Sequence, residues 1–177
     1  MLAAVALAAV VAVLVVVVNV LGDPGATDDD TADGRPPADI SGGTVSPRDD
    51  TSPVEVATPP VTPEADATCP ALMSSLPVEL AGERSRPVVS ESPYAYAWGD
   101  PASVLVCGVP VPPGLQPDSF VIGINGVDWF VDTTDPAFYV YTTVGRVLPV
   151  EVRVPSEQDS ALVTALGPLV SAAVPVA

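Results

Sequence analysis

The stretch FVIGINGVDWFVD, residues 120–132, decides the fold. Its centre, Asn125-Gly126, is the dipeptide most typical of a two-residue hairpin turn, because both turn positions need a positive φ. The turn sets three apolar pairs on one face: Ile124 with Val127, Ile122 with Trp129, and Phe120 with Val131. A slip of one residue would send Asp128 and Asp132 inward, so the register is well specified.

Around this hairpin, residues 68–177 predict a small α+β domain with an antiparallel sheet. Apolar runs predict strands at 103–107 and 137–144, and alternation predicts another at 147–155. Because Pro149 falls in the outward set of that last strand, we expect it at a sheet edge or a bulge. Residues 77–93 carry Gly82 and three prolines, and we expect irregular structure there.

Two helices complete the predicted domain. Thr68 is a candidate cap for a short helix that carries Pro70 near its first turn. Ser156 and Asp159 have the spacing of a capping box before a C-terminal helix, in which Gly167-Pro168 predicts a kink or a break. Its apolar stripe comprises Leu162, Val163, Leu166, Leu169 and Val170. The helix is too short and interrupted for a membrane span, so we expect a core helix.

The amino-terminal segment, residues 1–22, predicts a transmembrane anchor. Residues 2–18 contain no polar side chain, and about 20 helical residues span a bilayer core of about 30 Å. The apolar run exceeds that of a secretory signal, which favours retention over the alternative, a cleaved signal and a secreted domain. We expect a single-pass protein in the cell membrane, with its amino terminus inside and its domain outside.

Residues 23–67 predict a disordered, acidic, proline-rich tether. They hold eleven acidic residues, two arginines and eight prolines, and no aromatic residue. Such a composition buries too little apolar area to offset the entropy of ordering. A calcium loop starting at Asp29 fails because Ile40 stands where a bidentate glutamate belongs.

The composition excludes several kinds of chemistry. The chain has no histidine and no lysine, which rules out histidine-based triads, lysine Schiff bases and imidazole metal sites. We expect no catalytic residue, metal or cofactor. The net charge of −16 argues against a nucleic-acid partner.

The two cysteines, Cys69 and Cys107, suit an oxidising exterior. They lie 38 positions apart, and a disulfide across that loop stabilises a domain by about 4 kcal/mol on the chain-entropy relation. Two free thiols are the alternative. The spacing does not resemble a CxxC redox or zinc pattern.

The carboxylates form no convincing catalytic pair. Asp128 and Asp132 share a strand face but lie about 13 Å apart by strand rise, which exceeds the separation in glycoside hydrolases. Glu79 and Glu83 would be neighbours only in a helix, which Gly82 disfavours. We expect a solvated surface role for all four.

The aromatic residues Tyr94, Tyr96 and Trp98 alternate and therefore share one face of an extended segment. With Asp100 and Arg146 they are a candidate binding surface for a sugar or a peptide. The alternative, which we favour, is packing beside the disulfide, because tryptophan in a small domain is usually buried.

The pieces CPALMSSLP, YAWGDPASVLVCGV, GVDWF and YTTVGR resemble an uncharacterised family of actinobacterial envelope proteins. The resemblance covers residues 69–155 and implies an envelope location and a shared fold, with no catalytic residue to carry over. We expect a non-catalytic binding or scaffold module acting on an envelope protein or a cell-wall polymer. The alternative is a carboxylate-dependent cell-wall hydrolase.

Overall fold

The computed structural model describes residues 52–177. The predicted membrane segment, the calcium-loop candidate and most of the predicted tether lie outside these residues. Within residues 52–177, no helix has both the length and the apolar character needed to cross a membrane.

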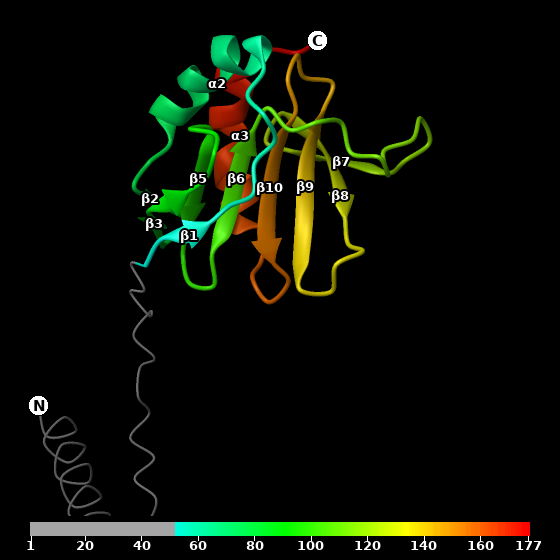
Figure 1. Ribbon diagram of the computed structural model, residues 1–177. Helices are drawn as coiled ribbons and strands as arrows, with labels where there is room; N and C mark the ends of the chain where they lie inside the picture. The colour runs from blue at the N-terminus through cyan, green and yellow to red at the C-terminus, as the bar shows by residue number, and fades with distance from the viewer. Residues whose placement is uncertain (1–51) are drawn as a thin grey trace, which may run out of the picture. The chain divides into compact units, whose positions relative to one another are not determined.

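Eight strands of the described residues form one antiparallel sheet, with α2 and α3 packed on it (Figure 1). In spatial order the strands are β2 (Glu79–Leu80), β3 (Glu83–Arg86), β5 (Ala95–Trp98), β6 (Ser103–Cys107), β10 (Val150–Pro155), β9 (Phe138–Val144), β8 (Val127–Asp132) and β7 (Val121–Ile124). Helix α2 is Pro63–Ser75 and helix α3 is Ala161–Ala173. A separate parallel pair joins β1 (Val54–Glu55) to β4 (Val88–Val89). The predicted α+β class is confirmed.

The hairpin of β7 and β8 has the predicted register. Ile122 pairs with Trp129 and Ile124 pairs with Val127, and both turn residues have a positive φ, 49° at Asn125 and 81° at Gly126. The prediction for Phe120 is wrong. Phe120 precedes β7 and is 81% exposed, because the ladder with β8 begins only at Val121.

Strand β10 is central in the sheet, not at an edge. It pairs with β6 on one side and with β9 on the other. Pro149 does not interfere because it lies just before the ladder, where its carbonyl accepts a hydrogen bond from the N–H of Gly108 at 3.0 Å. The missing N–H of the proline therefore removes no inter-strand bond.

Helix α2 starts earlier than predicted. Thr62, not Thr68, is the N-cap, and its hydroxyl accepts a hydrogen bond from the N–H of Ala65 at 3.2 Å. Pro63 follows the cap at a position where a missing N–H costs nothing. Together with β1, this helix places residues 54–67 in the folded domain rather than in a tether.

The stretch 77–93 is more regular than predicted. Strands β2 and β3 form a hairpin whose turn residues, Ala81 and Gly82, both have a positive φ. Alanine rarely adopts this conformation, so the sequence carries no recognisable turn signal at that position.

Helix α3 begins after Ser160 and runs without a break through Pro168. The predicted capping box is wrong, because the hydroxyl of Ser156 donates to the carbonyl of Pro136 instead. The N–H of Ala161 donates to the carboxylate of Asp159 at 2.8 Å.

The hydrophobic core lies between the helices and one face of the sheet, which α3 covers (Figure 1). The Cys69–Cys107 disulfide, as predicted, joins α2 to the end of β6 within this core. The chain after β1 crosses the opposite face, in front of β6 (Figure 1). Glu151, Arg153 and Thr142 of the central strands face this second side.

Candidate functional site

The predicted aromatic surface is part of the core. Trp98 is 0% exposed, its indole N–H donates to the carbonyl of Pro77 at 3.0 Å, and its ring lies 4.5 Å from that of Tyr96. Trp98 is thus buried, as the packing interpretation predicts, but its partner on β6 is Ser103 and not the disulfide residue Cys107. A fully buried indole offers no stacking surface to a ligand.

Tyr94 connects β5 to α2. Its hydroxyl donates to the carboxylate of Asp66 at 2.6 Å, and this hydrogen bond is the main reason why the pKa of Tyr94 is raised. The Tyr94 side chain therefore links α2 to the segment that leads into β5.

The two charged members of the predicted surface lie apart from each other. Asp100 forms an ion pair with Arg86 at 3.6 Å, beside β5. Arg146 donates to the carbonyls of Gly126 and Val174, at 2.6 and 2.9 Å. Three strands, β6, β10 and β9, separate β5 from the β7–β8 turn that holds Arg146. The five predicted residues do not make one surface.

The acidic pairs weighed from the sequence also stay apart. Glu79 pairs with Arg84, and Glu83 pairs with Leu80, across the β2–β3 hairpin. Asp128 and Asp132 share a face of β8, as expected.

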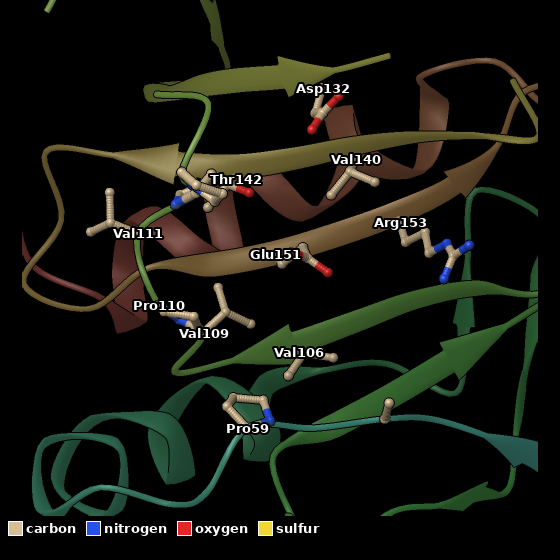
Figure 2. Close-up of a pocket in the computed structure, with 13 residues that line it drawn as sticks. Pro59, Val106, Val109, Pro110, Val111, Asp132, Val140, Thr142, Glu151 and Arg153 are labelled. Atoms are coloured by element: carbon tan, nitrogen blue, oxygen red, sulfur yellow. The ribbon is translucent and has the colours of Figure 1, made fainter. Parts of the chain in front are cut away.

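A groove of about 410 Å³ opens on the sheet face opposite α3. Its floor comes from β6, β10, β9 and β8, and its walls come from the chain after β1 and the loop after β6 (Figure 2). The lining residues of the walls are Ala57, Pro59, Val109, Pro110, Val111, Pro112 and Pro113. Those of the floor are Val106, Asp132, Val140, Thr142, Glu151 and Arg153.

The alternation of β10 delivers its charged side chains to this groove. Val150, Val152 and Val154 face the core, so Glu151 and Arg153 face the other side. Glu151 lies between Val106 of β6 and Thr142 of β9 in the ladder. The central position of β10 thus puts two charges in the middle of the sheet.

Glu151 is a half-buried carboxylate without a partner. Within residues 52–177 its carboxylate has no hydrogen bond and no ion pair. Burial raises the pKa of Glu151, Arg153 lowers it by a smaller amount, and the negative charge of Asp132 raises it further. A perturbed, unpartnered acid in a concavity is typical of a functional site.

Arg153 does not neutralise Glu151, because its guanidinium is engaged elsewhere. It forms an ion pair with Asp135 at 3.3 Å and lies 3.8 Å from the ring centre of Phe138. Figure 2 shows its guanidinium pointing away from Glu151.

Asp132 keeps its charge more readily than Glu151. Its carboxylate accepts a hydrogen bond from the N–H of Thr134 at 2.9 Å, and that bond lowers the pKa of Asp132.

Thr142 supplies a second unpartnered polar group. The residue is only 1% exposed and lines the groove, and its hydroxyl makes no hydrogen bond within the described part of the chain. The neighbouring Thr143, by contrast, accepts one from the N–H of Val150 at 2.9 Å. Because this hydroxyl has no protein partner and the residue lines the groove, the hydroxyl is available to a ligand.

Sequence reasoning missed this groove. The signal was present, because Glu151 and Arg153 alternate with buried valines. The expected edge position of this strand gave no reason to place its outward face in a groove. No sequence pattern predicts the groove walls, because residues 54–67 fall within the predicted tether.

The two acids of the groove floor come from different strands. Asp132 and Glu151 lie on strands separated by β9, which puts their backbones about 12 Å apart by strand spacing and rise. Among residues 52–177, no group of three or more metal-ligating side chains gathers to hold a metal ion.

Comparison with known proteins gives a family. The family described as "Protein of unknown function (DUF3515)" matches residues 3–177. No curated protein and no solved structure matches the chain.

Proposed function

The chain belongs to the DUF3515 family of proteins of unknown function, and we propose that it is a membrane-anchored, extracytoplasmic binding module of the cell envelope. Its ligand, part of an envelope protein or a cell-wall polymer, lies in the groove on the open face of the sheet. One observation carries this proposal: Glu151 and Thr142 meet in a concavity and neither has a partner within residues 52–177.

The groove has the size of a ligand site. Small-molecule sites have volumes of roughly 300–1,000 Å³ and combine mostly apolar walls with a few placed polar groups. Here the walls are proline and valine side chains, and the floor holds Asp132, Thr142, Glu151 and Arg153. A segment of a larger partner fits this volume better than a flat protein interface does.

The envelope location rests on the sequence. Residues 2–18 are uniformly apolar, the disulfide suits an oxidising compartment, and the chain resembles actinobacterial envelope proteins. A reporter active only outside the cytoplasm, fused after Ala177, will be active, and fractionation will leave the protein in membranes. A soluble form that begins near Asp23 would show a cleaved signal instead.

Photo-crosslinking in the host cell tests the groove. A benzophenone amino acid replaces Val111, which is 63% exposed in the groove wall. The matched control carries the same amino acid at Val147, an exposed valine that does not line the groove. We expect a discrete crosslinked product from position 111 and none of that size from position 147.

A second variant ties the product to the groove. Val140→Phe fills part of the floor, and Val147→Phe makes the same change outside the groove. The crosslink at position 111 will disappear with Val140→Phe and persist with Val147→Phe. A product that survives Val140→Phe, or that forms equally from position 147, would rule out the groove as the binding site.

A further inference from the structure

The groove floor offers two acceptors to a ligand. Glu151 and Thr142 are direct cross-strand partners, which sets their Cβ atoms about 5 Å apart. A carboxylate accepts hydrogen bonds only, and a hydroxyl accepts as well as donates. Both groups are unpartnered within the described residues. A donor placed between them would satisfy both.

The electrostatics of the floor favour a positively charged donor. Glu151 and Asp132 both face the groove, and the facing cation, Arg153, is paired with Asp135. Asp132 raises the pKa of Glu151, although Arg153 lowers it by a larger amount. Binding a cation removes this repulsion between the two carboxylates.

The surroundings of Glu151 favour an aliphatic stem behind that charge. Val106 and Val140 flank the polar floor, and Val111 stands in the wall. Prolines at positions 59, 110, 112 and 113 have no N–H to offer. Apolar walls around an anionic floor match a side chain with methylene groups and a charged tip.

We propose that the groove binds a lysine-type side chain: a primary ammonium on an aliphatic stem, carried by a peptide. The ammonium donates to the carboxylate of Glu151 and to the hydroxyl of Thr142, and the stem lies against the valines. This inference rests on the proposed function, because it names the ligand chemistry of the same groove. The peptide belongs either to the wall polymer or to an envelope protein.

Titration with a small probe tests the chemistry directly. The full chain in detergent micelles is titrated with Nα-acetyl-lysine methylamide, and backbone amide shifts are followed by NMR. We expect saturable shifts at Thr142 and its groove neighbours. The same probe acetylated on its ε-nitrogen keeps the stem and loses the charge. Equal binding of the two probes would overturn the proposal.

Matched variants separate this site from general attraction to an acidic protein. Glu151→Gln and Glu157→Gln each remove one negative charge, but Glu157 is exposed and outside the groove. Losing a hydrogen bond to a charged group costs about tenfold or more in affinity. Glu151→Gln will weaken probe binding by that factor, and Glu157→Gln will not. Equal effects of the two variants would overturn the proposal.

Thr142 is tested by a conservative pair. Thr142→Val keeps the shape and removes the hydroxyl, and Thr142→Ser restores the hydroxyl. Probe binding will fall in the first variant and return in the second. If both variants bind the probe as the native chain does, Thr142 is not part of the ammonium site and the proposal is wrong in that respect.

The crosslink at Val111 distinguishes this inference from the proposed function. If Val140→Phe abolishes the crosslink but Glu151→Gln leaves it intact, the groove binds a ligand that is not an amine. If neither variant affects it, the proposed function itself fails. Digestion of the product by wall hydrolases or by proteases identifies which source carries the amine, and acetylation of that source will abolish the crosslink.

Discussion

The side-chain amide of Asn125 donates a hydrogen bond to the backbone carbonyl of Thr164 at 2.8 Å. In an uninterrupted helix that carbonyl would accept from the N–H of residue 168, but residue 168 is a proline. The hairpin turn therefore supplies the donor that α3 lacks. This relationship explains how the helix continues through Pro168 without a break.

Asn125→Gly will reduce the free energy of unfolding by about 1–2 kcal/mol. Glycine keeps the positive φ of the turn, so the loss comes from one hydrogen bond, about 1 kcal/mol, and from greater freedom of the unfolded chain. Ala81→Gly is the control, since Ala81 also has a positive φ and glycine relieves its strain. Urea unfolding will show a loss in the first variant and none in the second.

Gly167→Ala will destabilise the domain although alanine is the better helix former. An added Cβ would lie 2.9 Å from the Cβ of Asn125 and 3.0 Å from the carbonyl oxygen of Ile124. Overpacking of this kind costs about 1–3 kcal/mol, which exceeds the gain of about 1 kcal/mol in helix propensity.

Ser171→Ala, at an exposed position of the same helix, is the control for Gly167→Ala. It will be neutral or slightly stabilising. A Gly167→Ala variant that melts higher than the native protein would show that α3 and the turn can separate without cost.

The sequence predicts the hairpin and both helices because their signals are local. Asn125-Gly126 needs no distant partner to form a turn, and the alternation of β8 depends on neighbours two residues away. The groove, by contrast, cannot be predicted from local signals. It requires that β10 be central and that residues 57–59 return across the sheet, and both are consequences of tertiary pairing.

Pro149 illustrates why the sequence alone places the strand over 147–155 at a sheet edge or a bulge. A proline near a strand indicates an edge only if it falls inside the ladder. The paired strand starts at Val150, directly after Pro149, which removes the conflict, and no local pattern distinguishes this start from the predicted one at residue 147. Glu151 therefore lies in the middle of the sheet and not at its edge.

Loss of the disulfide will reduce the free energy of unfolding by about 4 kcal/mol on the chain-entropy relation, since Cys69 and Cys107 close a loop of 38 residues. Cys69→Ala, Cys107→Ala and the double variant will be equally unstable. Urea unfolding of all three checks this expectation. A double variant much less stable than either single one would mean that the cysteines stabilise the core separately.

Trp98→Ala will cost about 3–5 kcal/mol, the usual loss for a buried tryptophan, because Trp98 is fully buried. Trp98→Phe will cost less, since it keeps most of the volume and loses the hydrogen bond to Pro77. Thermal unfolding measures both. An unchanged melting temperature combined with a lost crosslink at Val111 would instead assign Trp98 to binding.

Glu151→Gln will stabilise the unliganded domain at neutral pH. The pKa of Glu151 is raised in the folded protein from an ordinary value of 4.5, chiefly by burial. The folded state therefore binds this proton more tightly than the unfolded state does. The tighter binding of this proton contributes to the free energy of unfolding. That contribution is complete at pH values below the ordinary pKa and is lost as the pH rises through the folded-state pKa. Glutamine, which is never charged, avoids that loss.

The advantage of Glu151→Gln over the native protein will thus be largest near pH 7 and will vanish below about pH 4.

Asp132→Asn has the opposite sign, because the hydrogen bond from Thr134 lowers the pKa of Asp132. That variant will be the less stable protein at pH 7, and its deficit will shrink as the pH falls below the ordinary pKa of an aspartate and through the lowered pKa of folded Asp132. Urea unfolding at a series of pH values measures both curves. If Glu151→Gln proves less stable than the native protein at pH 7, the carboxylate already has a stabilising partner. It is then not available to bind a cation in the groove.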